Sequence, residues 1–428
     1  MRDGMRDGMR DVIVVGGGPV GMMLACLLAA EGLDVEVLER RTEPSMRSRA
    51  IGIHPPSLRA LARIGVADAL IERAVQIEDG VVECDRHRLG RMEFTRVGAE
   101  YPFVAALPQY ETEALLRQRF DQLAPGRVRG GAIVTGVRDA GDHVDVDVDV
   151  DVREAPAAPG RTAQPTEVPT GTAQPTEVPT GTVQARYVVG ADGARSVVRA
   201  AAGIRFTKYG PPATYLMGDF DTEPLASEQY MHQNGAGSAK TAHSRAVLYF
   251  ERGGVVESFP LPGGRRRWVA MTDRLSPGAS SADLAGIIRW RTGVDVGVPL
   301  GPASAFAVQQ HLAARLVAGR IALVGDAAHE ISPIGGQGMN LGWLDAVQLA
   351  PALRRAIRET DAAPSALETY DRRRRRTART AAVQAGFNMA MGRPRTGALL
   401  AARNALVRSL AAPPASALVA RAFTMRWL

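Results

Sequence analysis

The chain has 428 residues, 46% of them apolar and 23% charged, so it has the material for a sizeable core and is not a disordered protein. That length exceeds one ordinary domain and suits two that share an interface. The formal net charge is +7, but 45 acidic residues nearly balance 52 basic ones and no nucleic-acid-binding module is present, so we expect no nucleic-acid partner.

Neither the start of the chain nor any later segment predicts a membrane span. Residues 1–11 repeat the letters MRDG and are expected to lie outside the fold. The apolar run Val12–Leu33 is interrupted by glycines, and no other stretch offers about twenty apolar residues. With only Cys26 and Cys84, we expect no disulfide framework. The sequence predicts a soluble, cytoplasmic protein without a membrane partner.

Residues 10–40 have the pattern strand, glycine turn, helix, strand. An apolar strand leads into Gly16-Gly-Gly18-Pro-Val-Gly21, which fits the GxGxxG fingerprint of dinucleotide-binding proteins. Gly16 would permit a tight turn, and Gly18 would let the backbone approach a pyrophosphate. Gly21 would let the next helix pack closely on the strand, with its amino-terminal amides facing the phosphate charge.

An acidic residue completes this pattern. The helix is expected over Met22–Glu31 and the second strand over Val35–Leu38, and Glu39 follows 18 residues after Gly21. A carboxylate at that place can accept hydrogen bonds from ribose hydroxyls. The segment therefore predicts a dinucleotide site, but the fingerprint alone leaves both NAD and FAD open. Further along, a helix is expected over Glu111–Leu123.

The middle of the chain contains a low-complexity segment. Val144–Val152 alternates valine with aspartate, the pattern of a strand with one buried face. The decapeptide AQPTEVPTGT then occurs twice, at residues 163–172 and 173–182. Its proline content is too high for a helix or a central strand. We expect residues 153–184 to form a surface loop that carries no chemistry.

Residues 205–318 contain short alternating runs that predict antiparallel strands, among them Ala246–Phe250, Val255–Leu261 and Arg267–Thr272. From residue 319 the chain opens with another strand and turn and then becomes helical. The arginine run Arg372–Arg376 is interpreted as a solvated helix face.

Two later strand ends favour FAD. One apolar strand ends in Gly190-Ala-Asp192-Gly193 and another in Gly325-Asp326. A carboxylate such as that of Asp326 can bond polyol hydroxyls. The loop 335–340 would open a helix and present its amides to an electron-rich atom. Such a positive end suits a flavin ring, which carries charge near N1 and O2 once it is reduced. His329 follows the second turn and is interpreted as a structural histidine.

Together these motifs resemble the single-component flavoprotein aromatic hydroxylases, the family typified by para-hydroxybenzoate hydroxylase and by polyketide-tailoring monooxygenases. The resemblance covers roughly residues 10–385. It is carried by the fingerprint with Glu39-Arg40, by Arg47-Ser-Arg49-Ala, by Pro108-Gln109-x-x-x-Glu113, by Gly190-Ala-Asp192-Gly193, and by Gly325-Asp326 with Pro333 to Asn340.

The resemblance implies an α/β fold with a Rossmann-like, glutathione-reductase-like FAD-binding domain, an inserted and mostly antiparallel β-sheet substrate domain, and a helical C-terminal tail. The FAD-binding domain is expected over 10–75, 105–200 and 319–385, and the substrate domain over 76–104 and 205–318. The tail, 386–428, is too short for the thioredoxin-like domain that many polyketide hydroxylases append. It is expected to pack on the FAD-binding domain or to form an oligomer contact, in a monomer or a homodimer.

The resemblance also implies roles for single residues. Glu39 should bind the adenosine ribose, with Arg40 and Val134 beside the adenine. Arg49 should lie near the pyrophosphate, where it meets the incoming nicotinamide nucleotide, and Asp326 should bind the ribityl chain. The implied cofactor-binding residues are Gly16, Gly18, Pro19, Val20, Gly21, Glu39, Arg40, Arg49, Gln109, Arg117, Val134, Asp192, Gly193, Asp326, Pro333, Gly336, Gly338, Met339 and Asn340.

The chemistry that the resemblance implies is hydroxylation of an aromatic or polyketide-type substrate. NADPH or NADH reduces the FAD, which reacts with O₂ to form a flavin C4a-(hydro)peroxide, and Pro333 should lie beside the reactive edge of the ring. The flavin carries the reaction, so no catalytic acid or base and no metal are assigned. Baeyer–Villiger or epoxidising oxygenation on the same fold, and more remotely a flavin-dependent reductase or an FAD-binding protein without turnover, remain alternatives.

Apolar and aromatic residues of the expected strands are candidates for the substrate wall. No arginine marks a small benzoate, so a bulky, polycyclic or phenolic substrate is expected. For each of these residues the competing interpretation is an ordinary core position. The candidates are Met217, Phe220, Tyr249, Phe259 and Trp268.

Overall fold

The computed structural model describes residues 8–45, 50–95, 100–150, 180–221, 244–331, 336–359 and 363–426. Two of the predicted cofactor-binding residues, Arg49 and Pro333, and the body of the decapeptide repeat lie outside this part of the chain. Within it, no helix is both long enough and apolar enough to cross a membrane.

The first sheet is built around the parallel strands that the fingerprint predicts. β1 pairs in parallel with β2 on one side and with β11 on the other, and β11 pairs in parallel with β19. All four carboxyl ends therefore meet at one edge of the sheet. The strands of this sheet are β1 (Arg10–Val15), β2 (Val35–Glu39), β8 (Val128–Gly130), β9 (Ala132–Asp139), β10 (Val144–Val150), β11 (Thr180–Gly190), β18 (Val317–Ala318) and β19 (Ile321–Leu323).

Helices pack on this sheet and on one another. α1 (Pro19–Ala30) contacts both α4 (Gln109–Leu123) and α9 (Gln337–Arg358). α1 begins three residues before its predicted start, because a proline in the first turn needs no amide partner. α1 buries Met22 to Leu28 without interruption, including Cys26, whose pKa is raised to about 12 by burial. The cysteine is therefore an inert packing residue.

The valine–aspartate alternation forms a strand, as predicted. In β10 the side chains of Val144, Val146 and Val148 are buried, and the strand pairs antiparallel with β9 and β11. The predicted loop boundary at residue 184 is wrong. β11 already begins at Thr180, because Thr180 to Gln184 pair with Asp149 to Asp145 and extend the hairpin into the end of the repeat.

The second sheet is mostly antiparallel and confirms the predicted strands between residues 246 and 272. Its one parallel pair joins β13 to β5, which brings residues 79–84 beside residues 246–251. Its strands are β5 (Asp79–Cys84), β6 (His87–Glu93), β12 (Phe206–Asp221), β13 (Ala246–Glu251), β14 (Gly254–Leu261), β15 (Arg265–Thr272), β16 (Val298–Pro299), β17 (Ser304–Ala313) and β20 (His329–Glu330).

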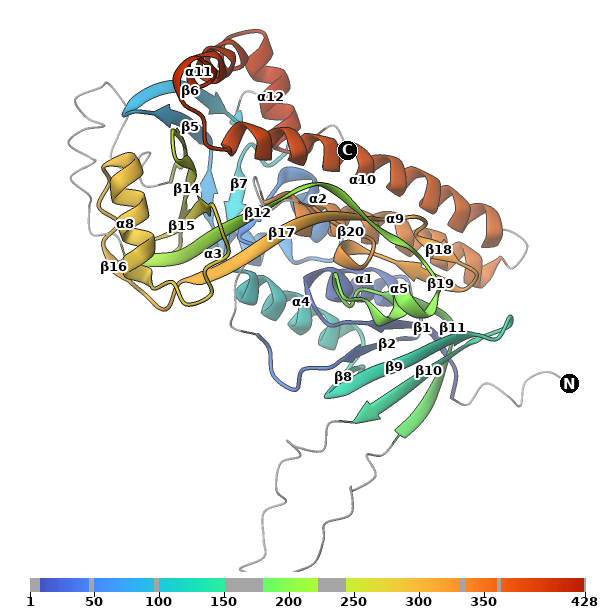
Figure 1. The fold of residues 1–428 in the computed structure, drawn as a ribbon. Coiled ribbons are helices and arrows are strands. Elements are labelled where there is room, and N and C mark those ends of the chain that lie inside the picture. The colour runs from blue at the N-terminus through green and yellow to red at the C-terminus, as the bar shows by residue number, and fades with distance from the viewer. Residues whose placement is uncertain are drawn as a thin grey trace, which may run out of the picture.

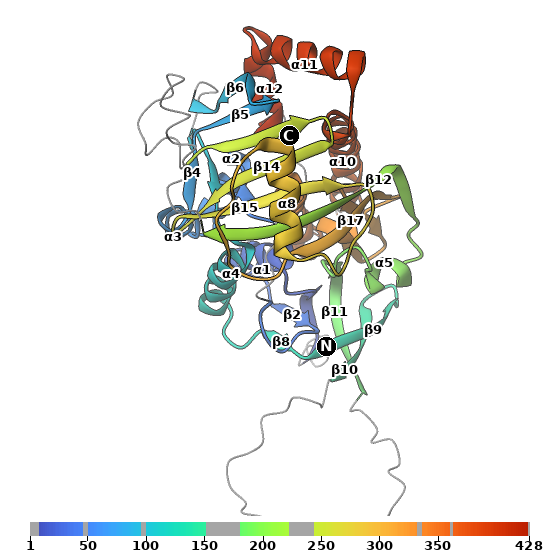
Figure 2. The same cartoon turned by 60° about the vertical axis from the view of Figure 1, so that its left-hand side comes forward.

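The two faces of the second sheet have different partners. α8 (Ser281–Thr292) lies across the face seen in Figure 2 and packs on β12 to β15. Its start is fixed by a capping box in which Ser280 and Asp283 bond each other's backbone amides. The opposite face looks toward the first sheet. A small third sheet of β3 (Gly52–Ile53), β4 (Val75–Ile77) and β7 (Val104–Ala106) and the helices α2 (Pro55–Ala62), α3 (Ala67–Arg73) and α5 (Val197–Ala201) complete this region.

The C-terminal helices connect the two parts of the molecule. α10 (Ala363–Gly392) packs along α9 and also contacts β12, β17 and β18, so the expected tail boundary at residue 386 falls inside a helix. α11 (Gly397–Ala411) and α12 (Ala415–Phe423) pack on β6, at the top of Figure 1. α11 covers an apolar face of the second sheet, whereas Ala420 and Phe423 of α12 pack with Ile77, Val104 and Ala106 of the small third sheet. That the tail packs on the FAD-binding domain stays a prediction.

Candidate functional site

A cavity of about 600 Å³ extends from the carboxyl ends of the parallel strands to the inner face of the second sheet. Its size is in the range of small-molecule sites. Most of the predicted cofactor-binding residues line it, although they come from widely separated parts of the chain. The predicted residues on its wall are Gly16, Gly18, Pro19, Val20, Glu39, Arg40, Gln109, Val134, Asp192, Gly193, Met217, Phe259, Asp326, Gly336, Gly338 and Met339.

The fingerprint glycines differ in what surrounds them. Gly16 has φ +106°, a conformation that side chains disfavour. A Cβ at Gly21 would overlap the carbonyl oxygen of Gly16, so Gly21 keeps α1 close to β1. A Cβ at Gly18 would meet nothing within 4 Å, although Gly18 is the N-cap of α1 and lines the cavity. The amino terminus of α1 therefore faces open space, as an anion site requires.

Glu39 ends β2 at the wall of the cavity and is held firmly. Its Oε2 accepts a hydrogen bond from the amide of Gly17 at 2.7 Å, and its Oε1 accepts from the amide and the Nε of Arg41 at 3.0 and 2.9 Å. Burial would raise the pKa of Glu39, but the hydrogen bonds and charge of Arg41 and the amide of Gly17 outweigh it and lower that pKa. The carboxylate is therefore ionised at neutral pH.

The sequence analysis did not identify Arg41 as the basic residue that holds Glu39. Arg40, which was expected beside the adenine, lines the cavity and is exposed, whereas the next residue, Arg41, makes the ion pair with Glu39. An i, i+2 pair at a strand end has no distinctive sequence pattern, and only the turn of the backbone after β2 brings the guanidinium back to the carboxylate.

Asp192 follows the end of β11, and one of its two carboxylate oxygens accepts hydrogen bonds from the backbone. Its Oδ2 accepts hydrogen bonds from the amides of Val197 and Val198 at 2.7 and 3.2 Å, and so fixes the start of α5. Its Oδ1 is buried and has no partner among the described residues, while the residue lines the cavity. Such an acceptor fits a hydroxyl of a bound polyol or nucleotide.

Asp326 lines the cavity on a short turn that a buried charge network supports. The turn is η3 (Gly325–Ala327), and the amide of Gly325 donates to Asp345 Oδ2 at 3.1 Å. The same carboxylate bonds His329 Nε2 at 2.6 Å and Arg374 Nε at 2.6 Å. The structural interpretation of His329 agrees with this arrangement, in which the ring is fully buried.

This network corrects the interpretation of the arginine run. Arg372, Arg373 and Arg376 are exposed, as expected of a solvated helix face, but Arg374 is only 1% exposed and pairs with Asp345. Burial would raise the pKa of Asp345, yet the charges and hydrogen bonds of His329 and Arg374 lower it. The pair holds α10 against the turn that carries Asp326.

The start of α9 forms the next part of the wall. Gly336 is the N-cap, in the left-handed region at φ +65°, and Gly338 and Met339 line the cavity. Asn340 does not line it. Its Oδ1 accepts from the amide of His54 at 2.9 Å, and its Nδ2 donates to the carbonyls of Gly52 and Gly336 at 2.8 and 2.7 Å. Asn340 is therefore placed to brace this loop rather than to contact a ligand.

Gln109 and its neighbours form the side wall. Gln109 lines the cavity at the start of α4 and donates to Glu113 at 2.7 Å. Burial raises the pKa of Glu113. Arg117, one helical turn further on, does not line the cavity, and its charge lowers the pKa of Glu113 slightly against the effect of burial.

Three of the five predicted substrate-wall residues face the wrong way. Phe220 and Trp268 are buried in the cluster beneath α8, and Tyr249 packs on the same cluster, with its ring stacked on Trp268 at 6.0 Å. Successive side chains of a strand point to opposite faces of the sheet, and these three lie on the face that α8 covers. Met217 and Phe259 lie on the other face and line the cavity.

The sheet end of the cavity contains polar residues that the sequence did not single out. Arg267 lines it and binds Asp219 through two hydrogen bonds of 2.7 Å each, so its charge is matched. Glu257 of β14 also lines it and is 4% exposed. Both belong to alternating strand stretches, in which sequence alone does not tell the inward face from the outward one.

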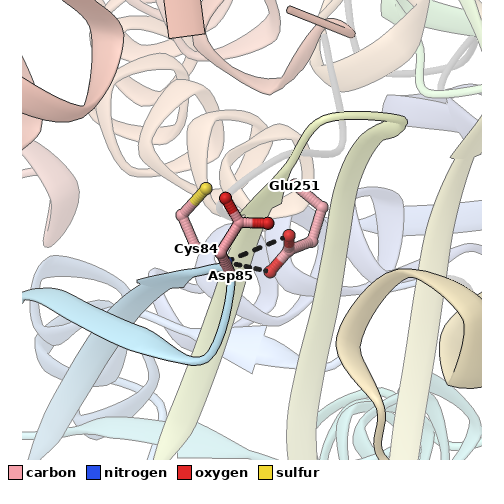
Figure 3. A group of neighbouring side chains, drawn as sticks. All are labelled: Cys84, Asp85 and Glu251. Atoms are coloured by element: carbon pink, nitrogen blue, oxygen red, sulfur yellow. Dashed lines mark hydrogen bonds between the residues drawn. The ribbon is translucent and has the colours of Figure 1, made fainter. Parts of the chain in front are cut away.

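A second group of side chains lies away from this cavity. Cys84, Asp85 and Glu251 come together where the β5–β6 hairpin turns beside the end of β13 (Figure 3). Asp85 has φ +49°, and its amide donates to both oxygens of Glu251 at 3.1 and 3.2 Å. These contacts explain the cluster as the cap of a tight turn.

The model of the family described as FAD binding domain matches residues 9–385. The curated 6-methylpretetramide 4-monooxygenase of Streptomyces rimosus is 30% identical over 369 residues, which are 84% of this chain and 58% of that protein. The dialkyldecalin synthase of Streptomyces rugosporus is 30% identical over 370 residues, 85% of this chain and 69% of that protein.

The similarity extends to solved structures. The p-nitrophenol 4-monooxygenase of Pseudomonas putida DLL-E4 matches with a TM-score of 0.77 and 24% identity, and the match covers 98% of this chain and 97% of that one. At that identity the likeness concerns the fold. The chain spans less than two thirds of the length of the first relative, the 6-methylpretetramide monooxygenase.

Proposed function

The chain belongs to the FAD-binding domain family, and on that premise we propose that it is an FAD- and NAD(P)H-dependent monooxygenase that hydroxylates an aromatic or polyketide-type substrate. The observation that carries the proposal is the single cavity in which the dinucleotide motifs and an apolar sheet face meet. A site of this kind can hold a cofactor at one end and an organic substrate at the other.

The residues at the first end fit FAD. The helix terminus at Gly18 is open toward a pyrophosphate, Glu39 is ionised beside it, and Asp192 presents a buried acceptor without a partner among the described residues. Asp326 and the start of α9 lie further along the same wall and suit the ribityl chain and the flavin ring. When bound, FAD supplies the oxidation–reduction chemistry and the reaction with O₂.

The task of this chain is then to bind, orient and exclude water. The Asp345 network holds the Asp326 turn rigid, and Asn340 holds the start of α9 against β3. Met217, Phe259 and Val269 give the opposite wall an apolar surface that keeps water from the reacting region.

The substrate class follows from the lining and from the named relatives. Among the described residues, the wall at the sheet end is apolar apart from Glu257 and the matched pair Arg267–Asp219, so this part of the chain offers no free cation to a carboxylate there. The 6-methylpretetramide monooxygenase is named for a polyketide and the p-nitrophenol monooxygenase for a phenol. An uncharged polycyclic phenol fits both observations.

The architecture that we propose is an FAD-binding domain around the parallel sheet with a substrate domain inserted in it. Pairing supports this division, because β5 and β6 join the antiparallel sheet although they precede α4 and β8 of the parallel one. The domain boundaries are proposed as 10–75, 105–200 and 319–385 for the first, and 76–104 and 205–318 for the second.

The test begins with the purified protein. We expect it to be yellow, to release FAD on denaturation, and to oxidise NADPH faster when a polycyclic phenol is added, with one atom from labelled O₂ in a phenolic product. Absence of FAD would remove the basis of the proposal. A product two hydrogens heavier would show a reductase, and a product of unchanged mass would show a cyclase. Oxygen inserted beside a carbonyl would show Baeyer–Villiger chemistry.

A pair of variants tests the position of the cofactor. Glu39→Gln removes the ionised acceptor at the end of β2 and should weaken FAD binding about tenfold, the range for a hydrogen bond to a charged group. Glu36→Gln, in the same strand but bonded to Arg10 at 3.0 Å and away from the cavity wall, should leave FAD affinity unchanged. Equal losses in both variants would indicate a general effect on β2.

A further inference from the structure

Glu257 is a buried acid on the substrate wall that the proposed function does not use. It lies in β14 between Val255 and Phe259 on the same face, and its neighbour in β15 is Val269. The residue is 4% exposed and lines the cavity, and its Oε1 is buried with no partner among the described residues. A buried carboxyl oxygen without a partner is costly, so its presence on a cavity wall points to a ligand.

The described elements that pack against Glu257 present apolar side chains to it. β13 offers Leu248 opposite it, and β4 and β7 contribute Ile77, Val104 and Ala106 to the cavity. On the neighbouring strand β15, the charged residue closest to Glu257 is Arg267, which lies opposite Phe259. Its guanidinium forms an ion pair with Asp219. Elsewhere on the cavity wall the titratable groups are His54, Glu39, Arg40, Arg41, Glu113, Asp192, Arg195, Asp326 and Glu330.

We propose that the Glu257 carboxyl group anchors a hydroxyl group of an uncharged aromatic substrate, which donates its hydrogen bond to Oε1. This inference rests on the proposed function. It deepens that function, because it makes Glu257 the residue that selects hydroxyarenes over the corresponding ethers and carboxylates. An ether has no hydrogen to donate, and an arene carboxylate would bring a second acid to a wall where the one nearby guanidinium that the structure describes, Arg267, is already paired with Asp219.

Selectivity of this kind is strong in a buried site. A site built to hydrogen-bond a hydroxyl rejects the analogue that lacks one, because its own polar group is then left without a partner. The ionised carboxylate is the stronger acceptor. Burial raises the pKa of Glu257 to about 8, so the preference for the hydroxyarene should grow as the pH rises toward that value.

The experiment measures binding to the FAD-loaded protein by equilibrium dialysis and needs no turnover. The three probes share one ring system: 2-naphthol, 2-methoxynaphthalene and 2-naphthoate. At about pH 8, where the carboxylate form is well populated, we expect 2-naphthol to bind at least tenfold more tightly than the ether, with 2-naphthoate weaker still. The ratio of naphthol to ether affinity should increase several-fold with rising pH, up to about pH 8.

Two substitutions distinguish the effect of having a hydrogen-bond acceptor at position 257 from the effect of its ionisation. Glu257→Leu removes the acceptor and should bring the ratio close to one. Glu257→Gln keeps an acceptor of the same shape without a titrating group, so a smaller preference should remain and should not change with pH. The matched control is Glu83→Gln in β5, because burial also raises the pKa of Glu83 but the residue does not line the cavity. It should behave as the unsubstituted protein does.

Several results would overturn the inference. For the unsubstituted protein, these are equal affinity for 2-naphthol and 2-methoxynaphthalene, or no binding of 2-naphthol. For the variants, they are a pH-dependent ratio of naphthol to ether affinity that persists in Glu257→Gln, or loss of that pH dependence in Glu83→Gln. The unsubstituted protein alone decides the first two, so a variant that fails to fold does not block the test. Failure of the proposed function is recognised separately, by absence of FAD or of oxygen transfer.

Discussion

The two ends of the cavity are built in different ways. At the parallel sheet the wall is made largely of backbone: glycine turns, a helix terminus and strand ends, with Glu39 and Asp192 fixed by amides. At the antiparallel sheet the wall is made of side chains from neighbouring strands, such as Met217, Glu257 and Arg267. A backbone wall constrains residue type strongly, whereas a side-chain wall depends on strand parity and register. The first end is therefore suited to an invariant ligand and the second to a variable one.

The largest effect is expected from the glycine that brings backbone elements together. Gly21→Ala places a Cβ against the carbonyl oxygen of Gly16 and should destabilise the protein by on the order of 3 kcal/mol, with loss of FAD. Gly18→Ala meets no atom within 4 Å of its Cβ, so it should leave the unfolding temperature unchanged and weaken FAD binding alone. Thermal unfolding and FAD dialysis of both variants measure this. Equal loss of stability in the two would contradict the contrast.

The buried network beneath Asp326 should have an effect of similar size on stability. Asp345→Asn leaves Arg374 buried without its counter-charge and should cost about 3–5 kcal/mol in the free energy of unfolding. Because the pKa of Asp345 is lowered in the folded chain, its contribution is present above the unfolded value of about 4 and is lost as the pH falls through the folded value. Denaturant unfolding at several pH values measures it.

A surface pair serves as the control for that measurement. Glu359→Gln breaks an ion pair with Arg355 in which both side chains are more than half exposed, and it should cost no more than about 1 kcal/mol. A cost as large as that of Asp345→Asn would mean that burial of the network does not set its strength.

Glu257 should make stability depend on pH in the opposite direction. Its folded pKa is about 8, above the unfolded value of about 4.3, so between these values the folded chain holds a proton that the unfolded chain has released. Stability should fall as the pH rises through this window, by at most about 1.4 kcal/mol per pH unit, and level off above it. Glu257→Gln should remove this slope in unfolding experiments. An unchanged slope would show that Glu257 is not the group responsible.

The smallest effect is expected on the face beneath α8. Tyr249→Phe changes a ring that packs on Trp268 away from the cavity, so it should alter 2-naphthol affinity less than about twofold. Met217→Ala, on the cavity face of β12, removes apolar contact and should weaken the same affinity about tenfold or more. Dialysis with 2-naphthol compares them. A larger effect at Tyr249 would mean that the assignment of the two faces is wrong.

The sequence determined the cofactor end of this protein because backbone geometry there restricts residue type. Glycines at 16, 18 and 21, an acid at the end of the second strand and the Gly325-Asp326 turn can be found without a structure, since few other residues satisfy those conformations. The valine–aspartate alternation likewise predicted β10, because a half-buried strand imposes a period of two.

The tertiary structure alone decided the substrate end and the supports beneath the cofactor end. Which face of β12 and β15 meets the cavity depends on where α8 packs, so Phe220 and Trp268 could not be told from Met217 in advance. Arg374 reads as one of five solvated arginines until α10 folds back on Asp345. Glu257 is recognised as a buried acid on the cavity wall only when strands from distant parts of the chain surround it with apolar side chains. The roles of these residues depend on packing between segments far apart in the chain, and such packing leaves no local pattern in the sequence.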